Sequence, residues 1–394
     1  MKIKPLVFII LLFSLLFLSL RFSNFSSKLE FSYDQGFHLI DSLEIIKTHK
    51  LRMIGPEVTS KIFQGRQFYI GPHYYYILSI LGFITNWDPV KITGLIVIVE
   101  YFFFLFLIKY IYQKFGLWQS LITAILFAIS PYFVSHARFF WNPHFILPVS
   151  ILFIIYFNNL FLASILWGIA FSFHYTAILW VIPLLISLIN QKKFNLKNIL
   201  IILAGFIIGD LPFFIFELRH NFYNLKTIFL VFSNFGGTGS SSPHYFIYPL
   251  FILIFWGLLL LSKKYKIPFY LLILLFLLFK ADPGLDQIKG WTYQEQLKVR
   301  DIILKDTCPK NYNIAATMQG DTRFHSLRFL LIRAKCPPIA EDNYQDNQIL
   351  YLVAPKHRTP ETENVWEVAS MRPFIIEKTI PINNEIILYT IKRK

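Results

Sequence analysis

The stretch Phe31-Ser-Tyr-Asp-Gln-Gly-Phe-His38 follows the first apolar run of the chain, residues 5–21. From Asp34 to Lys47 the apolar residues recur at helical spacing, and we expect one face of this helix to be formed by Phe37, Ile40, Leu43 and Ile46. Asp34 therefore lies near the N-terminus of a predicted helix, just beyond a segment long enough to cross a membrane. This carboxylate is the first candidate for chemistry in the chain.

The composition indicates a membrane protein. The chain has 394 residues, of which 55% are hydrophobic and 18% aromatic, with a mean hydropathy of +0.51. A soluble globular protein does not need so much apolar surface. The net charge of +15 is not accompanied by a long basic block or an RNA-binding signature, so we expect no nucleic-acid partner.

Apolar runs separated by short polar loops predict about nine transmembrane helices. After the first run at residues 5–21 they cover 90–109, 117–134, 144–159, 160–174, 175–190, 198–216, 246–262 and 267–280. Residues 22–89 form a long first outer loop, and Tyr74 to Ile84 within it is too short to cross, so we expect an interfacial or re-entrant helix there. Phe235 to Ser242 is predicted to be a flexible outer loop.

The lysines decide the predicted orientation. An uncleaved first helix with a cytoplasmic N-terminus places one group of lysines inside, as the positive-inside rule requires: Lys109, Lys114, Lys192, Lys193, Lys197, Lys263, Lys264 and Lys266. The chain is therefore predicted to be a multi-pass protein of the cytoplasmic membrane with its C-terminal part outside.

The composition becomes mixed and polar from Ala281 onward. Residues 281–394 are predicted to form a small extracytoplasmic α/β domain, after a transmembrane domain at 1–280. We expect helices at Leu285–Lys305 and Phe324–Lys335, and strands at Asn313–Met318, Ile349–Ala354, Phe374–Glu377 and Glu385–Ile391. The two cysteines, Cys308 and Cys336, leave open one disulfide or two free thiols.

Several motifs occur in a fixed order on the predicted outer side. The Asp34 loop is followed by Gly71-Pro-His-Tyr-Tyr-Tyr76, then Ser130-Pro-Tyr-Phe-Val-Ser-His-Ala-Arg138, then Trp141-Asn-Pro143. This order resembles the C-type membrane glycosyltransferases, in particular the protein O-mannosyltransferase and aminoarabinose transferase relatives, over about residues 1–280. The resemblance implies a mainly α fold of that architecture, a polyprenyl-phosphate-linked sugar as donor, and a lipid, glycan or protein as acceptor. It implies no cofactor.

By this resemblance Asp34 takes the place of the catalytic base. Sugar transfer from a lipid phosphate requires that the attacking hydroxyl lose its proton, and a carboxylate within hydrogen-bond reach can accept it. The phosphate leaving group is already a stable anion and needs cations rather than a general acid. The alternative is that Asp34 only caps its helix.

Arg138 is a candidate phosphate ligand because a guanidinium binds phosphate in a bidentate manner. It lies beside His136 and Trp141, and an interfacial Arg–Trp anchor is the alternative. Asn142 stands where relatives often carry a second acid, so we predict no metal site.

Further outer residues could contact the substrate. His73, Tyr74 and Tyr75 could stack on a sugar or line an isoprenoid groove, although an aromatic belt explains them equally. Arg66 could help bind the phosphate or be solvated. A second wall of the site is predicted to contain Glu217, Arg219 and His220. Asp210 and Glu100 are ionisable residues within or beside apolar runs, where such groups are costly and often functional.

Two other function classes remain open. A transporter or lipid flippase would also have many spans, but transporters place polar residues at mid-membrane. Here the polar residues gather on one face, which favours an enzyme that works at an interface. The third class is a non-catalytic assembly protein whose C-terminal part binds a partner.

Overall fold

The computed structural model describes residues 5–58, 65–233, 257, 291–306, 308, 311–318 and 320–394. These residues are mainly helical and divide into two compact units. The first unit contains residues 1–23, 44–83 and 92–283; the second contains 24–43, 84–91 and 284–394. The predicted division at residue 280 differs from this one, because two pieces of the predicted first outer loop belong to the second unit.

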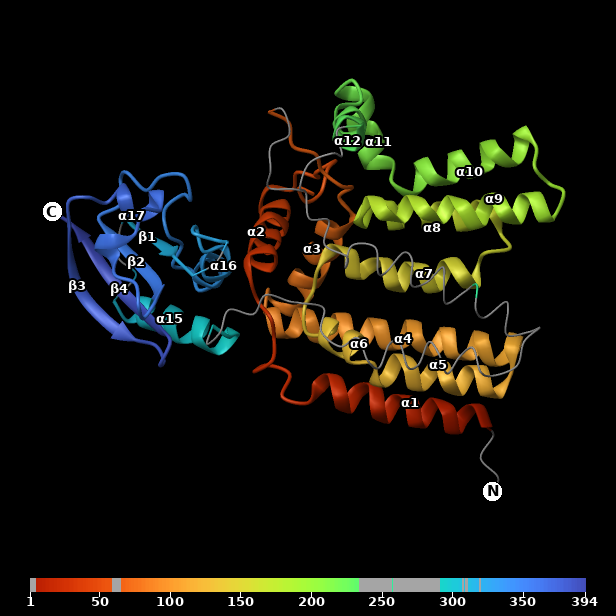
Figure 1. Cartoon of the computed structure of the whole chain (residues 1–394), viewed down its shortest axis with the longest axis horizontal. Coiled ribbons are helices and arrows are strands. Elements are labelled where there is room, and N and C mark those ends of the chain that lie inside the picture. The colour runs from red at the N-terminus through yellow and green to blue at the C-terminus, as the bar shows by residue number, and fades with distance from the viewer. Residues whose placement is uncertain are drawn as a thin grey trace. The chain divides into compact units, whose positions relative to one another are not determined.

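The first unit contains several helices that run alongside one another in Figure 1, namely α1, α4, α5, α7, α8 and α10. Its elements are α1 Pro5–Phe22, α3 His73–Thr85, α4 Pro89–Phe115, α5 Leu117–Ile129, α6 Pro131–His136, η1 Asn142–Phe145, α7 Ile146–Ile155, α8 Leu160–Phe173, η2 Tyr175–Trp180, α9 Val181–Asn190, α10 Leu196–Gly209, α11 Leu211–Arg219 and α12 Tyr223–Ser233. Helix α1 packs on α5, and α8 packs on both α7 and α10.

Glycines allow α8 and α10 to approach closely. A Cβ on Gly168 would lie 2.2 Å from the Phe206 carbonyl oxygen, and one on Gly209 would lie 2.2 Å from the Ile165 carbonyl oxygen. Gly205 and Gly209 are four residues apart on α10, which is the small-residue spacing that lets membrane helices pack backbone to backbone. The sequence reading did not use this spacing.

Two described helices, α1 and α4, are long and apolar enough to cross a membrane. The pair α10 and α11 would add a third crossing, but it is bent by 89°. These helices indicate a membrane location, and the count of nine stays a prediction. The runs at 246–262 and 267–280 and the Phe235–Ser242 loop lie outside the described residues.

Prolines divide two of the predicted spans. The run at 117–134 breaks at Ser130, because Pro131 cannot continue a helix and disfavours helical backbone before it. The run at 198–216, expected to be one crossing, breaks at Asp210, two residues ahead of Pro212. The predicted helix at Tyr74–Ile84 is present as α3.

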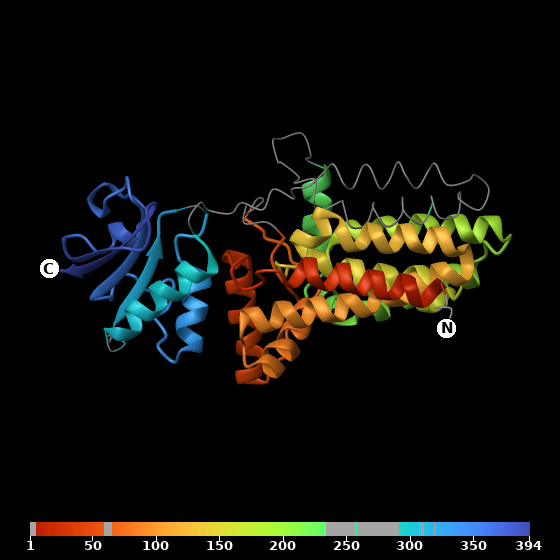
Figure 2. The ribbon, with the colours of Figure 1, turned by 90° about the horizontal axis from the view of Figure 1, so that it is seen from below.

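The second unit contains a four-stranded sheet and the helix α2, Tyr33–Thr48, up to Leu43. The strands are β1 Tyr312–Ala316, β2 Ile349–Pro355, β3 Phe374–Pro381 and β4 Ile386–Arg393, in the order β1-β2-β4-β3. β1 and β2 are parallel, and the other two pairs are antiparallel. The helices are α15 Tyr293–Lys305, α16 His325–Arg333 and α17 Trp366–Ala369 (Figure 2).

Both faces of the sheet are covered. Val299 and Ile303 of α15 and Leu327 of α16 pack on one face against Tyr351 and Val353 of β2. The opposite face carries Leu350 and Leu352, which pack with Tyr344, Val368 and Met371. The four predicted strands and the predicted helix at 324–335 are confirmed within a few residues. The described part of the predicted 285–305 helix is α15.

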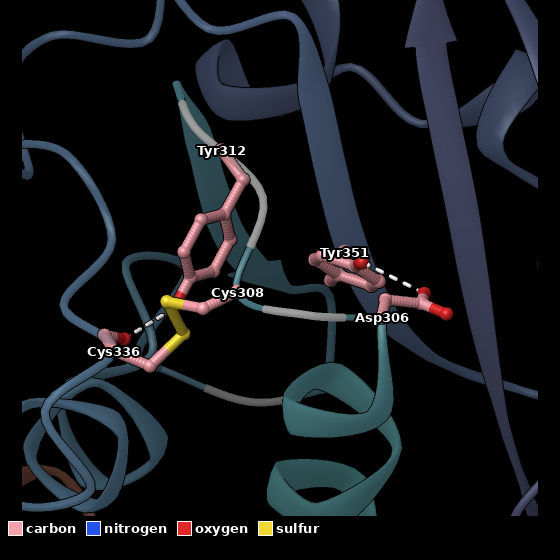
Figure 3. The surroundings of a disulfide bond; sticks show 5 residues. All are labelled: Asp306, Cys308, Tyr312, Cys336 and Tyr351. Carbon is pink, nitrogen blue, oxygen red and sulfur yellow. Dashed lines mark hydrogen bonds between the residues drawn. A yellow bond between two sulfur atoms is a disulfide. The ribbon is translucent and has the colours of Figure 1, made fainter.

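Cys308 and Cys336 form a disulfide with a Cα–Cα distance of 5.6 Å (Figure 3). It joins the segment after α15 to the segment after α16. Beside it the Tyr312 hydroxyl donates a hydrogen bond to the Cys336 carbonyl oxygen, and Tyr351 donates to Asp306 over 2.9 Å. The sequence left open one disulfide or two free thiols, and the structure has the disulfide.

Candidate active site

Asp34 lies in the first turn of α2, and Ser32 occupies the N-cap. The Gln35 side-chain oxygen accepts hydrogen bonds from the Ser32 backbone N–H over 3.0 Å and from its hydroxyl over 2.7 Å. The helix is therefore closed by a pair three residues apart, as in a capping box. Because α2 begins at Tyr33, Asp34 lies inside the first turn and not at the N-cap, and an acid at this position is favourable for the helix dipole. Its role as the catalytic base stays a prediction.

The segment that leads into Asp34 is fixed inside the second unit. Phe31 is buried, with its ring 5.7 Å from that of Tyr293 and 6.0 Å from that of Phe329. The Gln296 amide donates to the Phe31 carbonyl oxygen over 2.6 Å. Residues of α15 and α16 therefore determine where α2 begins.

In the first unit, His73 belongs to a buried polar cluster with Ser172 and Asp210. Its Nδ1 lies 2.6 Å from the Ser172 hydroxyl and 3.4 Å from Asp210 Oδ1. The Asp210 carboxylate is fully buried, whereas the His73 side chain keeps 27% of its exposure. A Cβ on Gly71 would lie 2.0 Å from the Ser172 hydroxyl and 2.3 Å from Asp210 Oδ1. A side chain at position 71 would displace Ser172 and Asp210, so glycine lets the backbone pass close to this cluster.

Sequence reasoning found His73 but did not connect it with Ser172 or Asp210. The signal for Asp210 was a single acid beside a proline in an apolar run. Ser172 carried no signal, because a serine is ordinary in a membrane helix.

Tyr74 and Tyr75 are buried in the first unit, with 0% and 2% exposure. Tyr74 donates a hydrogen bond to the Phe140 carbonyl oxygen over 3.4 Å, and the Arg52 guanidinium lies 5.4 Å from the Tyr75 ring centre. The two rings serve as core residues, and their contact with a substrate stays a prediction.

His136 pairs with a second histidine. Its Nδ1 lies 2.7 Å from Nε2 of His144, and Nδ1 of His144 lies 2.8 Å from the Phe139 carbonyl oxygen. A carbonyl oxygen can only accept, so His144 donates from Nδ1 and, as a neutral ring, accepts at Nε2 from His136. Both rings are buried, which gives His136 a structural role; substrate contact stays a prediction.

Arg138 binds the end of α1. Its Nη2 donates to the carbonyl oxygens of Leu20 over 2.9 Å and Ser23 over 3.4 Å. Arg21 does the same for α5, donating to Phe127 and Ala128 over 2.8 and 2.9 Å. A cation at helix-end carbonyls is stabilising. Arg138 thus has a structural role, and phosphate binding by it stays a prediction.

The Glu217 carboxylate holds the start of α12. It is fully buried and accepts hydrogen bonds from the backbone N–H groups of Asn224 over 3.1 Å and Leu225 over 3.0 Å. The Asn224 amide donates to it over 2.9 Å and in turn accepts from the Tyr69 N–H over 3.0 Å. These contacts fix Glu217 at the start of α12, and its place in a second wall of the site stays a prediction.

Helix α12 and Arg66 line a shallow cavity of about 520 Å³ that is widely open at the surface. Its cations are Arg66 and Lys226, and its apolar walls are Phe222, Leu225, Phe229 and Leu230. Two cations beside apolar walls suit an amphiphile with an anionic head group. The structure therefore places Arg66, a predicted phosphate ligand, at an apolar surface.

Arg219 and His220 are exposed at the end of α11. Arg219 contacts the Met53 sulfur over 3.8 Å, and the His220 ring stacks on Phe216 and hydrogen-bonds its carbonyl oxygen over 2.9 Å. Their place in a second wall stays a prediction. Among the described residues, no group of three or more His, Cys, Asp or Glu side chains could hold a metal ion. The expected absence of a metal and of a cofactor remains a prediction.

Comparisons with known proteins bear on the fold. No family model matches the chain, and no curated protein matches it in sequence. The structure is similar to the crystal structure of ArnT from Cupriavidus metallidurans in the apo state, with a TM-score of 0.51. The match covers 96% of this chain and 97% of that chain at 10% sequence identity, so it shows a likeness of fold.

Proposed function

We propose that this protein is a C-type membrane glycosyltransferase that moves a sugar from a polyprenyl-phosphate donor to an acceptor. The reaction takes place at the outer face of the cytoplasmic membrane. The observation that carries the proposal is the likeness of fold, over 96% of the chain, to ArnT, an aminoarabinose transferase. The order of the outer-loop motifs in the sequence supports it independently.

Asp34 acts as the general base in this mechanism. Its carboxylate accepts the proton of the acceptor hydroxyl while the hydroxyl oxygen attacks the anomeric carbon of the sugar. The bond between that carbon and the phosphate oxygen breaks, and the polyprenyl phosphate leaves as an anion. Attack opposite the leaving group inverts the configuration, as the resemblance implies.

The cations of the first unit stabilise the leaving phosphate. Arg66 and Lys226 line the cavity whose apolar walls suit an isoprenoid chain. Positive charge at a departing phosphate stabilises the transition state more than a general acid would. Arg138 is the second candidate, although one of its nitrogens is bound to α1.

The outer location has chemical support. The Cys308–Cys336 disulfide persists in oxidising compartments and is rare in the cytosol. It belongs to the predicted extracytoplasmic domain. A cytoplasmic N-terminus agrees with the lysine distribution.

The direct test is transfer by the purified protein in lipid vesicles. Polyprenyl-phosphate sugars are supplied with lipid, glycan and protein acceptors, and release of polyprenyl phosphate is measured with glycosylated product. Equimolar release and product are expected. Movement of the donor across the bilayer with no product would favour the flippase instead.

Replacing both Arg66 and Lys226 by alanine should weaken donor binding. Charge-assisted hydrogen bonds contribute about 1.5–3 kcal/mol, so the donor KM should rise about 10- to 100-fold with a smaller change for the acceptor. Lys193→Ala removes an exposed lysine from the opposite predicted side and serves as the control. A donor KM equal to that of the control would exclude the cavity as the phosphate site.

A further inference from the structure

His325, the first residue of α16, lies between two carboxylates. Its Nδ1 is 2.9 Å from Asp321 Oδ1, and its Nε2 is 2.5 Å from Glu341 Oε2. Carboxylates only accept, so both ring nitrogens donate and the ring is an imidazolium. Burial opposes that charge, yet the hydrogen bonds to Asp321 and Glu341 prevail and raise the pKa of His325 to about 9.

The same carboxylate fixes the helix that carries the ring. Asp321 also accepts hydrogen bonds from the backbone N–H groups of Phe324 over 2.9 Å and His325 over 2.7 Å. Asp321 therefore holds both the His325 ring and the start of α16. The imidazolium cannot turn away without losing its hydrogen bond to Asp321.

The His325 ring contacts two aromatic residues of α2, one before and one after Asp34 in the sequence. The Tyr33 ring lies 4.8 Å away at 85°, and the Phe37 ring lies 5.3 Å away at 81°. Edge-to-face contacts of this kind stabilise a pair, and a cation near an aromatic ring adds electrostatic attraction. Tyr33 and Phe37 are one helical turn apart, so both contacts fall on one side of α2.

Gly36 brings the two helices into backbone contact between those rings. A Cβ on Gly36 would lie 2.4 Å from the Ser326 backbone nitrogen and 2.5 Å from the His325 carbonyl carbon. Both neighbours are backbone atoms at a helix start and cannot turn aside. The absence of a side chain at Gly36 is therefore a condition of this packing.

These contacts involve one side of the first turn of α2. Asp34 lies on the same turn but next to that side. At about 100° per residue, Tyr33, Gly36 and Phe37 cover an arc of about 100°. Asp34 lies about 60° beyond Phe37 on the same scale. These contacts therefore fix the backbone from which the Asp34 side chain extends.

We propose that the C-terminal part of the chain, residues 291–394, is a positioning element for Asp34, with His325 and the Gly36 contact as its working parts. The proposal rests on the function proposed above. It gives the C-terminal part a role in the reaction itself rather than in docking a partner. His325 is a positioning residue, because it acts through α2.

The charges around His325 make this element sensitive to pH. The charged groups are Asp321, Glu341, Arg323 and Arg328, and the uncharged titratable groups are His38 and Tyr33. Desolvation and the His325 charge together lower the pKa of His38 to about 3, so His38 stays neutral. The pKa of His325 is raised on folding, so its stabilisation is complete below about 6.5 and is lost as the pH rises through about 9.

Gly36→Ala gives the sharpest test. Alanine favours a helix more than glycine does, so a change that acted only on α2 would make it more stable. If the contact with α16 positions Asp34, the added Cβ must push the helices apart. Turnover should then fall about 10- to 100-fold, since small misplacements of a catalytic group have effects of this size, with little change in the donor KM. Lys47→Ala, at an exposed site of the same helix, is the matched control.

His325→Asn tests the second working part. Turnover should fall similarly, and the loss of wild-type turnover above pH about 9 should disappear from its pH profile. Hydrogen exchange in the full-length protein gives a readout without catalysis. Amides of residues 33–38 should exchange faster in both variants, and faster in the wild type above pH about 9 after correction for intrinsic rates.

The outcomes separate the two proposals. If the wild type transfers sugar and Asp34→Asn does not, but Gly36→Ala and His325→Asn keep turnover within two-fold, the positioning role is wrong and the function stands. If both variants leave the exchange of residues 33–38 unchanged, the positioning role is equally wrong. If the wild type transfers no sugar to any acceptor, the function is wrong and the positioning role falls with it.

Discussion

Asp34→Asn should fold, insert in the membrane and bind the donor lipid, yet transfer sugar about 100 to 10,000 times more slowly than the wild type. Asparagine cannot take the proton of the acceptor hydroxyl at neutral pH. Loss of a general base of this kind raises the barrier by roughly 3–5 kcal/mol.

The structure explains why folding should survive this change. Ser32 and Gln35 close the start of α2, so the N-cap does not depend on Asp34. Asparagine has nearly the same size, and the loss of the favourable interaction between the carboxylate and the helix dipole costs about 0.3–1 kcal/mol. Donor binding, measured separately from turnover, should stay within a few-fold.

Asp41→Asn is the matched control, because Asp41 lies seven residues on and therefore on nearly the same side of α2. It should transfer sugar at close to the wild-type rate. Asp34→Glu keeps a base but displaces it, and an intermediate rate is expected. Turnover of Asp34→Asn within a few-fold of wild type would remove Asp34 from the mechanism.

Local pattern was enough to predict several of the elements that the structure describes. The helix at 34–47, the helix at 74–84 and the four strands follow from periodicities of 3.6 and 2, which are properties of short windows. The breaks at Ser130 and Asp210 could have been placed from Pro131 and Pro212 as well. The bend of 89° could not, because it depends on how α11 packs.

Contacts between distant segments could not be predicted. Asp210 is one acid in an apolar run, and nothing in that run indicates that His73 would lie 3.4 Å from it. From the sequence, Gly36 is expected only to destabilise its helix, because nothing there indicates that the Ser326 backbone packs against it. Arg138 and Glu217 are predicted to contact the substrate, and the structure adds contacts with helix ends that the sequence did not indicate. In the sequence, a charged residue that contacts the end of a helix cannot be told from one that contacts a substrate.

Removal of the disulfide is expected to have the second large effect. Cys308→Ala with Cys336→Ala opens a loop between cysteines 28 residues apart, which should lower the free energy of unfolding of this part of the chain by about 3–4 kcal/mol. Alanine is chosen because Cys336 is buried and a serine hydroxyl there would need a new partner. Denaturant unfolding of the full-length protein, followed by hydrogen exchange of β1 and β2, measures the change.

The effect should reach Asp34, because Cys336 follows α16 and α16 contacts the first turn of α2. Dithiothreitol on the wild type should reproduce both the destabilisation and a loss of turnover, and should leave the double variant unchanged. An unfolding free energy within about 1 kcal/mol of the wild type would mean that the packing of both sheet faces suffices. If the double variant is destabilised but has normal turnover, the start of α16 keeps its position without the disulfide that follows the end of this helix.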